Sequence, residues 1–343
     1  MKSMKLLRRA SAAAVATAVF LAACSGSGPD PGGNTANTPA PANASGGLTL
    51  LTIGTADSGG SMYAAGAALA RAFMSRDTSL RFNINASTGS FSNVADLIGG
   101  QVDLALVSSD IANMAVRGKG AFEGKPAELR AIASVYTSIS NWMARDDSGI
   151  EYVHDLAGRS AAIGPESSAT DRAARNALEA VGVSMSDGTF VNAGLGSGAD
   201  MVASGELDAV HGFAGPPIPW QTRLAEDLPC HLLRYTAEEL ARILSAEPSY
   251  IPVVIPAGTY KGQTEDIGTF GAQCVLCVSA AMDEEQAYRL TELLCASLEE
   301  LAAAEPVLSG IAGELLESDD LPVQLHPGAE RFYREHRPEV FAN

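Results

Sequence analysis

Short apolar runs alternate with longer amphipathic stretches from Leu48 onward. The short apolar runs are typical of strands, and the longer amphipathic stretches are typical of helices that cover a sheet. This alternation predicts the α/β class, with a mainly parallel sheet flanked by helices. The expected strands lie at 48–54, 81–87, 102–109, 130–136, 141–147, 160–164, 208–215 and 272–280, and the expected helices at 62–76, 91–99, 171–181, 199–204 and 284–304.

Two short sequence motifs each occur twice in the chain. The sequence Ile-Gly followed by a small-residue loop occurs at 53–58 and again at 163–168, and Gly-Gln-Val-Asp at 100–103 returns as Gly-Glu-Leu-Asp at 205–208. Two lobes of like construction would produce such repeats. The matches are short, so coincidence is the other interpretation.

The first residues have the composition of a secretory signal. Positive charges near the start precede an apolar segment at 10–23, and Leu-Ala-Ala-Cys at 21–24 resembles a bacterial lipobox. We therefore expect a signal peptide at 1–23 and lipidation of Cys24. An ordinary signal peptide ending at Cys24 is one alternative. A transmembrane anchor is the other, and the apolar segment is short for it because a spanning helix needs about 20 apolar residues.

Residues 25–47 contain mainly Gly, Ser, Pro, Asn, Thr and Ala. Such a segment has too little apolar surface to order itself, so we expect a disordered tether at 24–47 and a folded protein that begins near Leu48. Together, the signal and the tether predict an extracytoplasmic protein, in the periplasm or at the cell surface, anchored to the membrane through Cys24.

Charge excludes one large class of partners. The 343 residues carry 23 Lys and Arg against 40 Asp and Glu, a net charge of −17. Binding to nucleic acid requires a basic face, so no nucleic-acid partner is expected. An anionic ligand would need a local pocket that offsets this acidic background.

Loops rich in glycine and hydroxyl groups follow several of the expected strands. In an open α/β sheet, ligands bind beyond the carboxyl ends of the strands, where helix N-termini offer free N–H groups to anions. Any single loop of this kind is more often just an N-cap, but repetition at successive strand ends favours a shared cleft. The expected ligand contacts are Thr55, Ser58, Ser61, Tyr63, Thr88, Gly89, Ser90, Asn93, Ser109, Asp110, Ser168, Thr170, Arg172, Gly215, Pro216 and Trp220.

Three of these side chains have specific expected roles. Arg172 would make a charge-assisted bond to a ligand carboxylate, or else be a solvated residue in the first turn of a helix. Tyr63 and Trp220 would pack on the carbon chain of the ligand, with a place in the core as the alternative for Trp220.

No catalytic motif emerges. Asp-Ser-Gly-Gly at 57–60 resembles the nucleophile segment of trypsin-like proteases, but the first histidine, His154, follows that serine, whereas the protease family places it before. Gly-Leu-Gly-Ser-Gly at 194–198 lacks the acidic partner of a dinucleotide site, and no P-loop or zinc-protease motif is present. We expect no enzyme activity, no cofactor and no metal.

The Cys-Val-Leu-Cys run at 274–277 lies inside an apolar strand. Residues three apart in a strand point to opposite faces, so a bridge between these two cysteines would be strained and buried free thiols are expected. Pairing of Cys230 or Cys295 with one of them stays open, because an extracytoplasmic compartment is oxidising.

Several segments resemble the TAXI family, the extracytoplasmic solute-binding proteins of a class of TRAP transporters. The most specific are IPAGTYKGQ at 255–263 and LHPGAERFYR at 325–334, joined by AGPP at 214–217 and VSSD at 107–110. The resemblance extends from Leu48 to the C-terminus.

The resemblance implies a two-lobed type II periplasmic-binding fold, each lobe a mainly parallel sheet flanked by helices, with a ligand cleft between the lobes. The first lobe would comprise 48–140 and 275–343, and the second 141–274. The family implies a monomer that captures a small solute, an amino acid such as glutamate or glutamine or a C4–C5 dicarboxylate, and delivers it to the integral membrane subunits of a TRAP transporter. A ligand sensor or surface lipoprotein with the same fold is the alternative function.

This chain departs from the family pattern in two loops. Asp57 interrupts a loop that is commonly Gly-Thr-Gly-Gly-Thr-Gly-Gly, and Glu166 and Asp171 flank the corresponding loop of the second lobe. The added negative charge favours a zwitterion, with one carboxylate and a cationic end, over a doubly charged anion.

Overall fold

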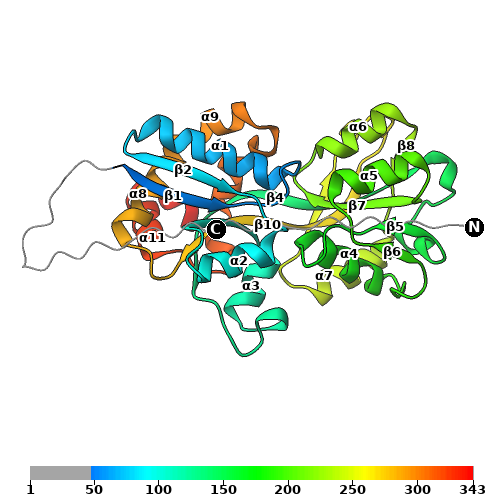
Figure 1. Cartoon of the computed structure of the whole chain (residues 1–343), viewed down its shortest axis with the longest axis horizontal. Coiled ribbons are helices and arrows are strands. Elements are labelled where there is room, and N and C mark those ends of the chain that lie inside the picture. The colour runs from blue at the N-terminus through cyan, green and yellow to red at the C-terminus, as the bar shows by residue number, and fades with distance from the viewer. Residues whose placement is uncertain (1–47, 343) are drawn as a thin grey trace, which may run out of the picture. The chain divides into compact units, whose positions relative to one another are not determined.

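The computed structural model describes residues 48–342 (Figure 1). The signal peptide, the lipidated Cys24 and the tether lie outside the described residues and remain predictions. Within the described part, no helix is long and apolar enough to cross a membrane.

One sheet contains all ten strands of the described chain, in the order β2-β1-β3-β10-β4-β7-β5-β6, with β8 paired to β4 and β9 paired to β10. The strands are β1 Thr49–Gly54, β2 Leu80–Asn85, β3 Leu104–Ser108, β4 Leu129–Arg145, β5 Ser160–Ala162, β6 Thr189–Val191, β7 Ala209–Ala214, β8 Cys230–Leu232, β9 Ile251–Ile255 and β10 Ile267–Ser279. The helices are α1 Ser61–Arg76, α2 Ser90–Ile98, α3 Ser109–Val116, α4 Ala169–Ala180, α5 Leu195–Ser204, α6 Pro219–Asp227, α7 Ala237–Ala246, α8 Glu284–Ala296, α9 Leu298–Ala304, α10 Ile311–Leu316 and α11 Pro327–His336.

Two parallel groups of strands form the two lobes of the α/β fold (Figure 1). In the first lobe β1 lies between β2 and β3, and in the second β5 lies between β6 and β7, all in parallel pairs. The long antiparallel strands β4 and β10 join the groups, since β4 pairs with β10 over one part and with β7 over another. The two-lobed α/β architecture expected for this chain, with parallel strands in each lobe, is confirmed.

The two lobes repeat one chain order. In each, a strand leads through a helix to an edge strand and through a second helix to a third strand, as β1-α1-β2-α2-β3 and β5-α4-β6-α5-β7. Asp103 accepts the Thr52 amide at 2.7 Å and donates its own amide to the Thr52 carbonyl at 2.8 Å. Asp208 forms the same pair of bonds with Ser160, at 2.8 and 3.0 Å. The repeat at 100–103 and 205–208 therefore marks equivalent places in two lobes of like construction.

The structure corrects several predicted element limits. The strands expected at 130–136 and 141–147 are one continuous strand, β4, which ends at Arg145, and hydrogen bonds satisfy the polar residues between them. Thr137, for instance, donates its hydroxyl to Glu314 at 3.0 Å. The expected lobe limits at 140 and 274 fall inside β4 and β10, and they remain a prediction.

The helix expected at 284–304 is two helices, α8 and α9. They meet at Ser297, whose hydroxyl donates to the Leu293 carbonyl at 2.6 Å and so competes with the regular backbone ladder. Helix α5 begins at Leu195, earlier than the expected 199, and helices α3, α6, α7, α10 and α11 were not predicted.

The cysteine prediction is confirmed for the described residues. Cys274 and Cys277 are fully buried free thiols in β10, and they lie in different hydrophobic clusters on opposite faces of the sheet. Cys230 and Cys295 are also free, so neither pairs with them.

Candidate ligand-binding site

A cavity of about 50 Å³ lies where the carboxyl ends of strands from both lobes meet the helix N-termini. By the roughly 10–15 Å³ that one water needs, it holds a few water molecules or a group of similar size, such as one carboxylate. The lining residues are Ala56, Asp57, Gly60, Ser61, Met62, Thr88, Gly89, Ser90, Ser108, Tyr136, Ser138, Pro165, Ser168, Ala169, Thr170, Leu195, Phe213 and Ala214.

Helix N-termini supply most of this wall. Helices α1, α2, α4 and α5 each begin at a lining residue, two helices from each lobe, and α3 begins directly after the lining residue Ser108. The N-cap residues Gly60 of α1 and Gly89 of α2 offer no side chain to their helix, so the first-turn N–H groups there have no capping oxygen. Free amides and the helix dipole at such positions favour a negative charge.

The loops of the two lobes approach each other closely at the cavity. Gly89 has a φ of 126°, and a Cβ there would lie 3.5 Å from the Cβ of Ser168 in the other lobe. Across the cavity, the Ser61 hydroxyl donates to the Gly215 carbonyl at 3.1 Å. Beside Ser168, Ser167 has a φ of 59°, the one positive φ among non-glycine residues of the described chain. Such backbone strain concentrates where a ligand is held.

Two strands form the floor of the cavity. Tyr136 and Ser138 project from β4, and Phe213 and Ala214 come from the end of β7. Burial raises the pKa of Tyr136 well above its usual value, so this phenol stays protonated. These four residues were not predicted, because a residue inside an apolar strand cannot be distinguished in the sequence from an ordinary core residue.

Six of the sixteen predicted contacts line the cavity: Ser61, Thr88, Gly89, Ser90, Ser168 and Thr170. Their convergence from both lobes is the arrangement that the repeated loops predicted. Whether they touch a ligand stays a prediction.

Other predicted contacts support the loops from within. The Thr55 hydroxyl donates to the Asn85 carbonyl at 2.9 Å, and the Asn93 amide group donates to the Leu106 carbonyl at 2.7 Å. Ser109 is buried, and its hydroxyl has no partner.

The remaining predicted contacts lie off the cavity lining. Ser58 is exposed, Tyr63 is half-buried, and Gly215 and Pro216 lie just beyond the lining residue Ala214. Trp220 is buried in the hydrophobic core of the second lobe, the alternative that the sequence left open for it.

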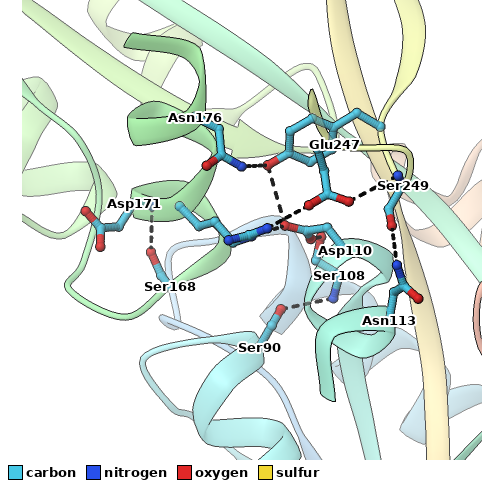
Figure 2. A network of polar contacts seen from close by, with 11 residues as sticks. Ser90, Ser108, Asp110, Asn113, Ser168, Asp171, Asn176, Glu247 and Ser249 are labelled. Atoms are coloured by element: carbon cyan, nitrogen blue, oxygen red, sulfur yellow. Dashed lines mark hydrogen bonds and ion pairs between the residues drawn. The ribbon is translucent and has the colours of Figure 1, made fainter. Parts of the chain in front are cut away.

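Arg172 and Asp110 pair with each other instead of lining the cavity (Figure 2). The Arg172 Nε lies 3.1 Å from an Asp110 oxygen, and a terminal nitrogen of Arg172 lies 2.6 Å from Glu247. The second Asp110 oxygen accepts the Ser108 hydroxyl at 2.6 Å. Two nitrogens of the Arg172 guanidinium are thus paired with carboxylates that do not line the cavity.

The cavity therefore has little formal charge. Among the described residues, no Lys, Arg or His lines it, and Asp57 is its one carboxylate. Amides and hydroxyls can hold an anionic group, and Asp57 at the exposed edge can hold a cationic one. No cluster suited to a metal ion occurs in the described part of the chain.

Comparison with known proteins agrees with this architecture. The model of the NMT1-like family matches residues 53–336. A protein of Bordetella bronchiseptica RB50 is similar in structure with a TM-score of 0.54 and 15% identity, over 84% of this chain and 98% of that one. A structure described as a periplasmic transporter matches with a TM-score of 0.51 and 10% identity, over 85% of this chain and 94% of that one. The alkanesulfonate-binding protein SsuA from Xanthomonas axonopodis pv. citri, bound to MOPS, has a TM-score of 0.46 and 18% identity, with 85% and 86% covered.

Proposed function

The chain belongs to the NMT1-like family, and we propose that it is an extracytoplasmic solute-binding receptor that captures a small carboxylate-bearing solute without chemical change. The observation that carries the proposal is the cavity on which helix N-termini from both lobes converge, with no side-chain cap on α1 and α2 of the first lobe or on α5 of the second. An open cleft admits the solute, amides and hydroxyls replace its water, and contacts from both lobes favour the closed state.

The lining favours a ligand with one carboxylate and a cationic end. The carboxylate fits the first-turn amides of Ser61, Ser90 and Ala169, which need no cation beside them. A second carboxylate would meet Asp57 with no counter-charge from the lining. We therefore place glutamine, a zwitterion with one carboxylate, ahead of glutamate and the C4–C5 dicarboxylates, which have two.

The resemblance to the TAXI family supports delivery to the membrane subunits of a TRAP transporter. Its two most specific segments have structural roles. In 255–263, the Tyr260 hydroxyl donates to Gln221 at 2.9 Å and holds the start of α6, while in 325–334 the Tyr333 hydroxyl donates to the Ile132 carbonyl at 3.0 Å. A signal peptide and a lipid on Cys24 would keep the receptor at the membrane. A ligand sensor with the same fold is the second candidate, since closure on a ligand serves signalling equally well.

A thermal-shift and calorimetric screen of the purified protein tests the binding proposal. The compounds are L-glutamine, L-glutamate, 2-oxoglutarate and succinate. A ligand at 100 times its dissociation constant adds about 2.7 kcal/mol to the free energy of unfolding, which raises the melting temperature measurably. If no amino acid or dicarboxylate shifts the melting temperature, the proposed ligand class is wrong.

The Asp57→Asn variant separates the two ligand classes. We expect it to bind the amino acid about tenfold more weakly, because the cationic end loses its partner, and to bind dicarboxylates more tightly. Asp200→Asn is the matched control, since Asp200 is an exposed carboxylate that pairs with Arg223. Equal affinities of the Asp57→Asn variant and the wild type for the amino acid would contradict the assigned role.

A further inference from the structure

We propose that Arg172 is a positioning residue. Its ion pairs with Asp110 and Glu247, here called the latch, hold the two lobes closed over the cavity. This inference rests on the proposed function for its effect on a ligand, but the latch itself is a property of the protein alone.

The latch joins the lobes directly (Figure 2). Asp110 lies in the first turn of α3, which follows β3 of the first lobe, whereas Arg172 lies in the first turn of α4 in the second lobe. Glu247 follows α7 and holds the other side of the guanidinium at 2.6 Å. Arg172 is thus held from one side by its own lobe and reaches across to the other.

Further hydrogen bonds run parallel to these ion pairs. The Tyr250 hydroxyl lies 3.5 Å from an Asp110 oxygen and accepts the Asn176 amide group at 3.1 Å. Asn113 of α3 donates to Ser249 at 3.1 Å. The segment after α7 therefore contacts α3 at two neighbouring points.

Burial explains why the cation is needed for closure. The Asp110 side chain is 0% exposed, against 25% for Arg172 and 15% for Glu247. Burial raises the pKa of Asp110, although the Ser108 hydroxyl and Arg172 oppose that effect. Without Arg172, closure would bury a carboxylate that has no cationic partner, and removal of one member of a buried pair is strongly destabilising.

The latch is adjacent to the cavity at both of its ends. Ser168 and Thr170 of the cavity wall precede Arg172 within one helical turn, and Ser108 precedes Asp110 by two residues. When the ion pair forms, it fixes the first turns of α3 and α4 against each other, and these turns carry lining residues from opposite lobes. The latch therefore acts on a ligand through lobe closure and not through contact.

The test compares Arg172→Gln with the double variant Asp110→Asn/Arg172→Gln. Arg175→Gln is the control, because Arg175 lies one turn further along α4 and pairs with Asp171 of the same helix at 2.7 Å. Small-angle X-ray scattering of the ligand-free proteins measures closure. We expect a larger radius of gyration for Arg172→Gln, recovery toward the wild-type value in the double variant, and no change in the control.

Stopped-flow tryptophan fluorescence then gives the dissociation rate of L-glutamine. We expect dissociation about tenfold faster in Arg172→Gln, partial recovery in the double variant and a change below twofold in Arg175→Gln. Recovery in the double variant excludes direct contact with the ligand and general misfolding, since the arginine is absent from both variants.

An unchanged scattering curve for Arg172→Gln would overturn the latch, and so would equal defects in the single and double variants. If Arg172→Gln does not fold, the double variant decides. A folded double variant with a radius of gyration near that of the wild type supports the unpaired Asp110 carboxylate as the cause of the defect. A folded double variant with a larger radius of gyration refutes the latch. Failure of wild-type protein to bind any compound would refute the proposed function, while the scattering comparison would still decide the latch.

Discussion

Substitution of Gly89 by alanine tests whether the cavity binds the ligand through the start of α2. Gly89 has φ 126° and ψ −155°, a conformation essentially restricted to glycine, so alanine there costs on the order of 1–3 kcal/mol. The smaller entropy of the unfolded alanine chain offsets about 0.4–1 kcal/mol, which leaves a net loss of up to about 2.6 kcal/mol in the free energy of unfolding. The new methyl group would lie 3.5 Å from the Ser168 Cβ, in ordinary contact, so no clash adds to this cost.

Gly100→Ala is the matched control, because Gly100 lies just after the other end of α2. Its φ is +69°, and a Cβ there meets nothing within 4 Å. Alanine in this left-handed conformation costs about 1–2 kcal/mol before the same offset, so the two variants should have similar stability. We expect L-glutamine affinity at least tenfold lower in Gly89→Ala, because relief of the strain turns the α2 amides away from the cavity, and a change within twofold in Gly100→Ala. Isothermal titration and urea denaturation measure both quantities, and equal affinities of the two variants would refute the assignment of α2 to the site.

Two further predictions concern a helix cap and a buried histidine. Ser168→Ala removes the hydroxyl that accepts the Asp171 amide of α4 at 3.1 Å, and Thr236→Ala removes the equivalent cap of α7. Each should lower the free energy of unfolding in urea by about 0.5–2 kcal/mol, but only Ser168→Ala should weaken ligand binding, and a similar loss of affinity in both would contradict the site. Burial lowers the pKa of His211 to about 3, so the unfolded chain alone binds this proton between pH 6.5 and about 3. Stability should therefore be complete above pH 6.5 and decrease by about 1.4 kcal/mol per pH unit below it, and a His211→Gln variant with the same pH slope as the wild type would refute this.

Local sequence patterns were sufficient for the strand, loop and helix that begin each lobe. At 53–61 and 163–169, an apolar strand, a glycine and a hydroxyl-rich loop lead into a helix, and the structure has β1-α1 and β5-α4 there. The continuity of β4 was not predictable in this way. Its polar stretch around Thr137 resembles a loop, and only partners far along the chain, such as Glu314, make it a buried strand.

The same distinction applies to the site. Hydroxyls at helix starts were predictable because the helix terminus itself requires polar groups. Tyr136 and Phe213 were not, since nothing in an apolar strand shows which residue faces a cavity. Arg172 was identified as functionally interesting, but its pairing with Asp110, 62 positions away, depends on how the lobes meet.

The latch also gives Arg172 a role in a strongly acidic receptor that does not require contact with the ligand. The arginine lies near the proposed anion site, but it binds two carboxylates of the protein. Two carboxylates hold Arg172, so the attraction for a ligand carboxylate comes from helix-start amides, and those of both lobes face one ligand only when the lobes converge. A ligand can shift the open–closed equilibrium only by its difference in affinity for the two states. A stable latch reduces the free energy of closure that the ligand must supply. If the latch kept the empty receptor closed, however, only the open fraction of the protein could admit the ligand, and the apparent affinity would fall in proportion to that fraction. Because Arg172 remains one-quarter exposed, water can compete for it, and the latch is weak enough to open for ligand entry.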